Sequence, residues 1–139
     1  MKRVLIVEDQ ADIRKLIRMT LEFESYEIHE ASDGAFGLRM ASAVRPDLVL
    51  LDVMMPGEMD GLQVCQAIKS NPALASVKVV LLTARVQAGD LEAGTQAGAD
   101  AYLAKPFSPL QLMDTIECLM AVVEASVSVP ATAPAYLKE

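Results

Sequence analysis

The chain has 139 residues, 53 % of them hydrophobic, which is enough to fill one core and too much for a disordered protein. Its formal net charge of −7 argues against binding of nucleic acid by this domain alone, and no apolar run is long enough to span a membrane. The short apolar start meets acidic residues too early for a signal peptide, and the two cysteines lack metal-ligand spacing, so we expect a cytoplasmic protein.

Stretches typical of strands and of helices alternate along the first half of the chain. Val4–Val7 is a continuous apolar run that predicts a strand buried on both faces. Residues 10–24 place their apolar side chains on one stripe of a helix, and Tyr26–Ala31 alternates like a strand with one wet face. Residues 33–44 are predicted to form an alanine-rich helix, and Leu48–Leu51 is a second continuous apolar strand.

The same alternation continues after the third strand. Asp60 is a suitable cap for a helix that ends near Ser70. Residues 77–82 are predicted to form the fourth strand. A helix over residues 86–97 should be weaker, because its glycines lower helix propensity.

A short strand over residues 100–104 and one long helix complete the pattern. Ser108 suits the N-cap of that helix and Pro109 its first position, where a missing N–H leaves no hydrogen bond unmade. Beyond this helix the composition shifts to alanine, serine and proline. We therefore predict one domain over residues 1–124 and a tail or linker over residues 125–139.

This order of elements predicts an α/β fold with a doubly wound sheet. Strict strand-then-helix alternation, (βα)5, requires parallel strands with helices on both faces. The first, third and fourth strands are continuously apolar and should be interior, whereas the second and fifth are alternating or short, as edge strands are. With right-handed crossovers this predicts a flavodoxin-like, five-stranded parallel sheet in the order 2-1-3-4-5.

Polar residues occur where four of the predicted strands end. Glu8 and Asp9 follow the first strand, Asp52 the third, Thr83 the fourth and Lys105 the fifth. Ligands of open α/β sheets bind at this carboxyl edge, so these side chains should converge. Three carboxylates against one ammonium leave an excess of negative charge that a divalent cation would neutralise. Oxygen ligands favour Mg²⁺, or Mn²⁺, over zinc.

A carboxylate beside such a cation can be a nucleophile toward phosphorus. Attack by Asp52 would form an aspartyl phosphate on the protein. Lys105 and Thr83 could then bind the oxygens of the new phosphoryl group. The strand-end residues are therefore compatible with transfer of a phosphoryl group onto the chain itself.

Four segments of the chain resemble one family. From about Lys2 to Val123 the chain is similar to the receiver domain of two-component response regulators. The resemblance is carried by Val4–Asp9, Leu50–Gly61, Leu81–Arg85 and Gly98–Phe107, in this order and at the ends of predicted strands. It implies a signalling domain that catalyses only its own phosphorylation and dephosphorylation, rather than an enzyme with a separate substrate.

The resemblance implies a role for each acidic residue at the predicted sheet edge. Asp52 corresponds to the phosphoacceptor. Glu8 and Asp9 correspond to the acidic pair that holds Mg²⁺, with Asp9 the more direct ligand. Asp52 and the backbone carbonyl of Met54 would complete the metal ligands on the protein.

The resemblance also implies a switch and a phosphate-binding cation. Thr83 corresponds to a hydroxyl that moves toward the phosphoryl group, and Tyr102 to an aromatic residue whose rotamer follows it. Lys105 corresponds to the lysine that binds the phosphoryl oxygens. The peptide bond between Lys105 and Pro106 is expected to be cis, which would aim the ammonium inward.

The partners implied by the resemblance lie on both sides of this reaction. The phosphoryl group would come from a phosphohistidine of a sensor histidine kinase or a phosphotransfer protein. Phosphorylation would then favour one of two existing states and change the face formed by the fourth helix, fifth strand and fifth helix. A downstream protein would bind that face, and a homodimer is compatible with the family.

Two positions depart from the family pattern. Glu58 lengthens the loop after Asp52 by one residue, where it could tune access to the metal site or simply face solvent. Ala101 stands where a second acid is usual. Neither departure removes a residue that the chemistry needs.

Other interpretations of these residues remain open. A pseudo-receiver would bind partners without phosphorylation, and a phosphohydrolase would also use Asp52, although Met54 stands where such enzymes carry a second Asp. Asp9 and Thr83 could be helix caps, and Tyr102 an ordinary strand residue. The basic residues of the first helix could dock an acidic kinase surface or simply be solvated: Arg14, Lys15 and Arg18.

Overall fold

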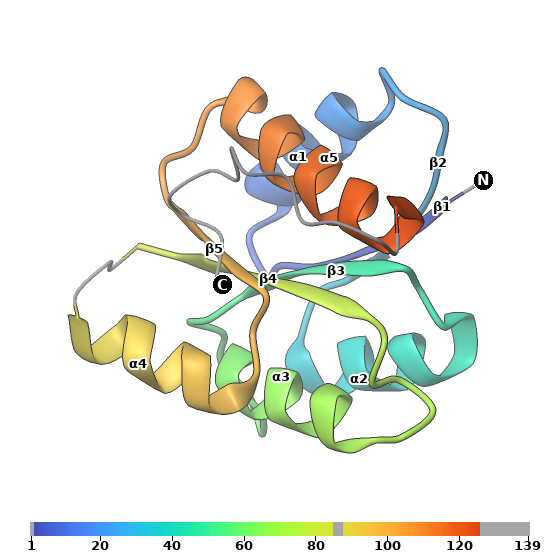
Figure 1. The fold of residues 1–139 in the computed structure, drawn as a ribbon. Coiled ribbons are helices and arrows are strands. Elements are labelled where there is room, and N and C mark those ends of the chain that lie inside the picture. Colours follow the sequence, from blue (N-terminus) through green and yellow to red (C-terminus); the bar gives the residue numbers. More distant parts are fainter. Residues whose placement is uncertain (1, 85–87, 126–139) are drawn as a thin grey trace.

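The computed structural model describes residues 2–84 and 88–125, and within them five strands alternate with five helices (Figure 1). The strands are β1 (Lys2–Val7), β2 (Tyr26–Ala31), β3 (Leu48–Asp52), β4 (Lys78–Thr83) and β5 (Ala101–Ala104). The helices are α1 (Ala11–Leu21), α2 (Gly34–Val44), α3 (Gly61–Ser70), α4 (Ala88–Ala97) and α5 (Pro109–Ala125). The tail predicted after α5 lies outside the described residues, so the boundary at residue 124 stays a prediction.

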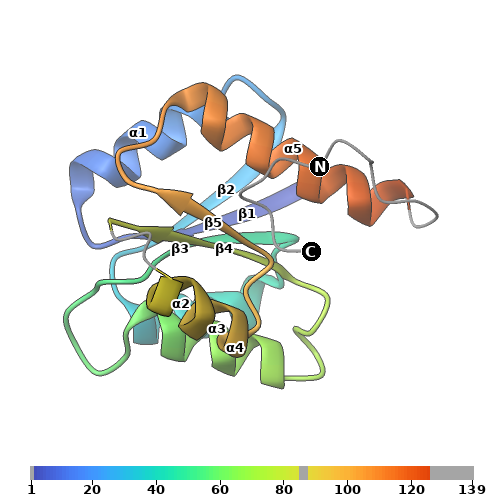
Figure 2. The same ribbon diagram turned by 60° about the vertical axis from the view of Figure 1, so that its left-hand side comes forward.

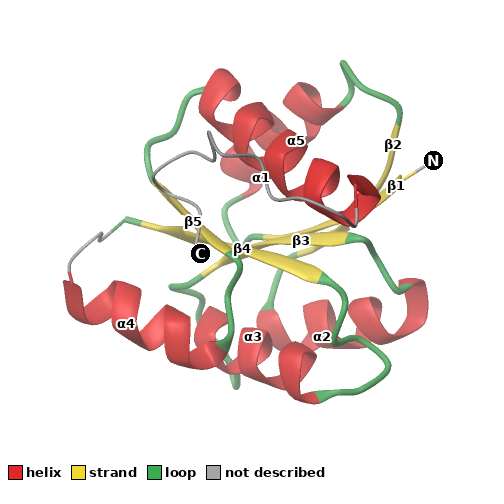
Figure 3. Cartoon of the chain, viewed as in Figure 1, coloured by secondary structure: helices red, strands yellow, loops and turns green. Residues whose placement is uncertain are grey.

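All strand pairs are parallel, and the sheet has the order β2-β1-β3-β4-β5. The predicted α/β fold, its strand order and its edge strands are therefore confirmed. Helices α1 and α5 cover one face of the sheet, and α2, α3 and α4 cover the other (Figures 2 and 3). Within the described ranges no helix combines the length and the apolar character that a membrane span needs.

The three interior strands supply the core of both layers. Their side chains alternate between the faces, so each strand is apolar along its whole length. One set packs against α2 and α3, and comprises Leu5, Val7, Val49, Leu51, Val79 and Leu81. The other set packs against α1 and α5, and comprises Val4, Ile6, Leu48, Leu50, Val80 and Leu82.

β2 has one face packed on the core and one partly exposed, polar face, in line with the wet face that its alternation predicts. The first five residues of this strand are all half-buried. On one face Tyr26 and Ile28 pack against the core beneath α1 and α5. On the other face Glu27 contacts Arg3, at 3.1 Å, and His29, at 2.8 Å. The Glu27 side chain keeps 44 % of its area exposed, so this face is open to water and also linked by contacts between polar side chains.

Two of the predicted helix starts are confirmed by their caps. The Asp60 carboxylate accepts a hydrogen bond from the Gln63 N–H, and the Gln63 side chain accepts one from the Asp60 N–H. Ser108 and Gln111 make the same reciprocal pair at the start of α5. Such a capping box satisfies two backbone donors at a helix start.

The first helix is shorter than the sequence pattern predicts. α1 starts at Ala11 after Gln10 as N-cap, and it ends at Leu21, where bonds from Glu24 N–H to Leu21 C=O tighten the chain into a turn. The described part of α4 starts at Ala88. The predicted start of that helix, residue 86, lies outside the described residues.

A half-buried ion pair between Lys69 and Asp100 holds the amino ends of β4 and β5 together. Lys69 Nζ lies 2.7 Å from Asp100 Oδ2 and donates a hydrogen bond to the Val77 carbonyl. The same Asp100 oxygen accepts from the Val79 N–H at 2.8 Å.

Ala101 is fully buried in the core beneath α5, so the small apolar residue fits the position where the family pattern has an acid.

Candidate functional site

The five predicted strand-end residues converge at the carboxyl edge of the sheet. Carboxylate oxygens of Glu8, Asp9 and Asp52 lie within 4.8 Å of one another. Lys105 Nζ lies 2.7 Å from Glu8 Oε1 and 3.2 Å from Asp52 Oδ1. Thr83 ends the strand between them and is buried. The side chains open into a pocket of about 210 Å³ lined by Asp9, Gln10, Asp52, Met54, Ala84 and Lys105.

Burial makes it costly to keep the carboxylates of this cluster charged. Glu8 is fully buried and Asp52 is 3 % exposed, so both carboxylates are withdrawn from water. Burial, and after it the hydrogen bond and charge of Glu8, together raise the pKa of Asp52 to about 7, against the opposing charge of Lys105. For Lys105, burial favours a lower pKa, but its contacts with Glu8 and Asp52 outweigh burial and raise the pKa above its ordinary value.

The cluster fits a hard divalent cation. Its donors are carboxylate oxygens grouped closely enough to share one ion, and their charge exceeds that of the one lysine that contacts them in the described residues. Met54 N–H donates to Asp52 Oδ1 at 3.2 Å, which brings the Met54 backbone to the site while its side chain faces solvent. Coordination by the Met54 carbonyl stays a prediction.

Backbone hydrogen bonds hold the strand ends in place. Lys105 N–H donates to the Thr83 carbonyl at 2.8 Å, and Val53 N–H donates to the Leu82 carbonyl at 3.0 Å. Gly61 N–H donates to the Val53 carbonyl at 3.0 Å, and its Cα approaches the Asp52 carbonyl so closely that a Cβ there would overlap the oxygen. Gly61 therefore lets the start of α3 pack closely against the backbone of Asp52.

Asp9 and Thr83 do not occupy the helix-cap positions that the alternative interpretation gave them. The N-cap of α1 is Gln10, the residue after Asp9. Thr83 is the last residue of β4, and Ala88 is the first described residue of α4. Both residues thus lie at the site that the strand-end argument predicts. Their roles in metal binding and switching stay predictions.

The side chain of Tyr102, a residue of β5, packs against α4. Its hydroxyl is 2.6 Å from the Thr95 hydroxyl of α4. A Cβ on Gly94 would overlap the Tyr102 ring, so the glycine that weakens α4 also lets the ring pack against it. In the β4–β5 ladder Ala104 pairs with Thr83, two residues along the strand from Tyr102. This placement is compatible with the predicted link between Thr83 and Tyr102.

The remaining expectations about the site loops have clear outcomes. The Lys105–Pro106 peptide bond is cis, as expected. Glu58 is exposed and follows Gly57, whose φ of +106° is a backbone conformation that glycine adopts easily. Its side chain therefore faces solvent in this structure.

Arg14 is a site residue that sequence reasoning missed. Its guanidinium donates to the Glu8 carbonyl at 2.8 Å and contacts Glu30 of β2 at 3.1 Å. Arg18 contacts the same carboxylate at 2.6 Å. The sequence shows a basic helix face, but the partners come from a strand 12 to 16 residues away. Only the tertiary structure brings them together.

Comparisons with known proteins agree with this fold and cluster. The family model of the response regulator receiver domain matches residues 4–117. The transcriptional regulatory protein ResD of Bacillus subtilis is 39 % identical over 118 residues, 85 % of this chain and 48 % of ResD. The response regulator MprA of Mycobacterium leprae is 40 % identical over 118 residues, 85 % of this chain and 50 % of MprA.

Two solved structures match this chain over nearly their own whole length. The chemotaxis protein CheY4 of Vibrio cholerae has a TM-score of 0.80 and 32 % identity, covering 84 % of this chain and 97 % of CheY4. The receiver domain of a signal transduction histidine kinase from Syntrophus aciditrophicus has a TM-score of 0.83 and 31 % identity, covering 95 % and 99 %. The chain spans about half the length of the curated relatives named above. It belongs to the response regulator receiver domain family of two-component signalling.

Proposed function

We propose that the chain accepts a phosphoryl group on Asp52 from a phosphohistidine of a sensor histidine kinase or phosphotransfer protein. One observation carries the proposal: a buried aspartate shares a pocket with a lysine and two further carboxylates. Such a cluster is costly unless a ligand or a cation uses it. Family membership supports the same reading, because receiver domains are signalling domains.

In the proposed step an Asp52 carboxylate oxygen attacks phosphorus. A P–O bond forms and the P–N bond to the donor histidine breaks, and its electron pair passes to the ring nitrogen. The donor leaves as neutral imidazole because its other nitrogen carries a proton. Oδ1 of Asp52 already accepts from Met54 N–H and contacts Lys105, so we assign the attack to Oδ2. Lys105 and the Thr83 hydroxyl would bind the transferred oxygens.

The residues that would hold Mg²⁺ are Glu8, Asp9, Asp52 and the Met54 carbonyl, with Mn²⁺ as an alternative ion. When bound, the ion would supply positive charge beside the phosphoryl oxygens. The chain would then return to its starting state by hydrolysis of its own acyl phosphate. We place this chemistry in the cytoplasm, where phosphoryl donors made from ATP occur.

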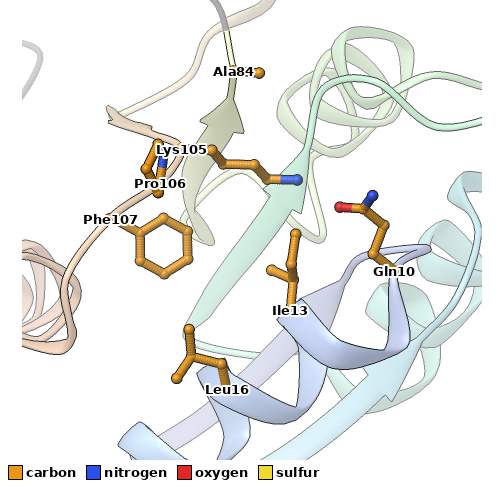
Figure 4. Close-up of a pocket in the computed structure, with 7 residues that line it drawn as sticks. All are labelled: Gln10, Ile13, Leu16, Ala84, Lys105, Pro106 and Phe107. Atoms are coloured by element: carbon orange, nitrogen blue, oxygen red, sulfur yellow. The ribbon is translucent and has the colours of Figure 1, made fainter.

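The donor protein is expected to contact an apolar pocket beside the acidic one. This pocket has a volume of about 360 Å³ and shares Gln10, Ala84 and Lys105 with the acidic site. In Figure 4 Ile13 and Leu16 of α1 face Phe107 across it. A protein that delivers a phosphoryl group to Asp52 must lie over this rim, and the exposed Leu16 would be buried there.

The output is proposed to be a change in the face formed by α4, β5 and α5. The Thr95–Tyr102 hydroxyl contact joins α4 to β5 on this face. If Thr83 moves toward a phosphoryl group, the neighbouring Tyr102 would repack, and a downstream protein would distinguish the two arrangements. We assign this chain itself no binding of nucleic acid, in line with its charge of −7.

Incubation of the purified chain with Mg²⁺ and acetyl phosphate is expected to add one phosphoryl group, read by intact mass. The Asp52→Asn variant and the wild type in excess EDTA should gain none. A wild type that binds Mg²⁺ but gains no mass with acetyl phosphate or a phosphorylated kinase would favour a phosphorylation-independent binding module. Turnover of a phosphomonoester would instead favour a phosphohydrolase, and a mass gain in Asp52→Asn would refute this acceptor.

Leu16→Asp is expected to slow transfer from any sensor kinase that phosphorylates the wild type by at least about tenfold, since a charge in a desolvated contact costs about 1.4 kcal/mol or more. Its reaction with acetyl phosphate should be unchanged, because a small donor needs no protein contact. Met19→Asp, on the same helix and also exposed, is the matched control. Equal slowing by both variants, or by neither, would contradict docking at this pocket.

A further inference from the structure

The loop that carries Glu8 and Asp9 is fastened in an unusual way. The loops before α3 and α5 end in capping boxes. At α1 the N-cap Gln10 makes no side-chain cap bond to the helix in the described structure. Instead the side chain of Arg14 reaches back to the loop, where its guanidinium donates to the Glu8 carbonyl at 2.8 Å.

The Arg14 guanidinium is itself held in position. Its Nε donates to Glu30 Oε1 at 3.1 Å, and Arg18 donates to the other oxygen of the same carboxylate at 2.6 Å. Arg14 is 21 % exposed, so water competes little for its donors. On the opposite side of the loop, Glu8 N–H donates to the Ala31 carbonyl at 3.1 Å. The two peptide groups that flank Glu8 are thus held, the preceding one by β2 and the following one by α1.

We infer that Arg14 is a positioning residue that sets the geometry of the Glu8–Asp9 pair for Mg²⁺ while touching neither the ion nor the phosphoryl group. The inference rests on the proposed Mg²⁺ site. Partners that orient metal ligands typically change metal affinity by tenfold or more when removed. Here the oriented group is a backbone carbonyl one peptide unit from the Asp9 side chain.

Electrostatics and positioning predict opposite effects of removing Arg14. Loss of a cation near an acidic cluster would tighten the binding of Mg²⁺. Loss of a positioning contact would weaken it. The chain also supplies a matched control, because Arg18 pairs with the same Glu30 carboxylate and contacts no atom of the loop in the hydrogen bonds that the structure describes.

The test compares Arg14→Met and Arg18→Met, which both lose one cation and keep an apolar stem. We expect Arg14→Met to raise the Kd for Mg²⁺ about tenfold by titration calorimetry, and Arg18→Met to leave it unchanged or slightly lower. Arg14→Lys, which keeps one donor and the charge, should fall between Arg14→Met and the wild type. Amide hydrogen exchange at residues 8–10 should accelerate in Arg14→Met and not in Arg18→Met.

Tighter or unchanged Mg²⁺ binding in Arg14→Met, or equal effects of the two methionine variants, would overturn the inference. If Arg14→Met does not fold, Arg14→Lys against Arg18→Lys gives the same comparison with the charge retained. Failure of the wild type to bind Mg²⁺ would refute the proposed metal site instead. The exchange rates at residues 8–10 would then still decide whether Arg14 fixes the loop.

Discussion

Replacing Asp52 by asparagine is expected to raise the free energy of unfolding of the metal-free chain at pH 8 by about 2 kcal/mol. The wild-type carboxyl is buried beside Glu8, and its pKa is raised to about 7, so its ionisation in the folded state costs free energy that an amide avoids. A pKa raised from 3.8 to about 7 corresponds to roughly 4 kcal/mol. We expect about half of this, because the pocket admits water and the amide must find new hydrogen bonds.

The gain should depend on pH in a defined direction. The folded-state pKa of Asp52 lies above its ordinary value, so the carboxyl contributes stability below about pH 4 that is lost as the pH rises through about 7. Asp52→Asn should therefore resemble the wild type near pH 4 and exceed it increasingly up to pH 8. Urea unfolding followed by circular dichroism measures both curves.

Two comparisons make this expectation specific to the cluster. Asp114→Asn removes an exposed carboxylate of α5 and should change the free energy of unfolding by less than about 0.5 kcal/mol. Mg²⁺ should stabilise the wild type more than Asp52→Asn, because a ligand stabilises the state that binds it. An Asp52→Asn variant that is less stable than the wild type at pH 8 would show that the carboxylate is not strained there.

Gly61→Ala is expected to lower the free energy of unfolding by more than about 3 kcal/mol, a loss typical of rigid overpacking combined with a broken hydrogen bond. The new Cβ would overlap the Asp52 carbonyl oxygen and crowd Val53 Cα at 2.7 Å. Neither side can move freely, because Val53 is hydrogen-bonded to β4 and Gly61 to Val53. Relief would require the amino end of α3 to shift away from Asp52.

Gly57→Ala is the matched control in the same loop. No atom lies within 4 Å of the Cβ that it would add, but its φ of +106° disfavours any side chain. It should cost about 1 kcal/mol from backbone conformation alone. Urea unfolding of the two variants compares them, and acetyl phosphate labelling should be slowed only in Gly61→Ala. Similar small losses for both would refute the close-approach role of Gly61.

The fold could be predicted because its strands follow a simple physical rule. Strands buried on both faces are apolar throughout, and β1, β3 and β4 satisfy this, so the strand order follows from the sequence pattern. The partners of the polar residues of β2 could not be predicted, because Glu27 and Glu30 lie on opposite faces of the strand and pair with arginines from β1 and α1. A pattern of single residues does not show which long side chains will pair with a polar residue on either face.

The residues at the strand ends of the candidate site could also be predicted. Residues at strand ends meet because parallel strands end at one edge, which brings Asp52, Glu8 and Lys105 together. No comparable rule predicts which side chains of helices and strands will contact one another. The bond from Arg14 to the Glu8 carbonyl and the fit of Gly94 against Tyr102 depend on how helices are seated on the sheet. The sequence shows these only as a basic helix face and a helix-weakening glycine.

The packing of Tyr102 of β5 against α4 has a spectroscopic consequence. The chain has three tyrosines and no tryptophan, so tyrosine emission is observed without a tryptophan background. Tyr102 shares a hydroxyl contact with Thr95 and packs on Gly94, whereas Tyr26 lies on the far edge strand of the sheet. A rearrangement of α4 against β5 would thus alter the fluorescence of the unlabelled protein, and Tyr102→Phe would identify the part of the signal that comes from this contact.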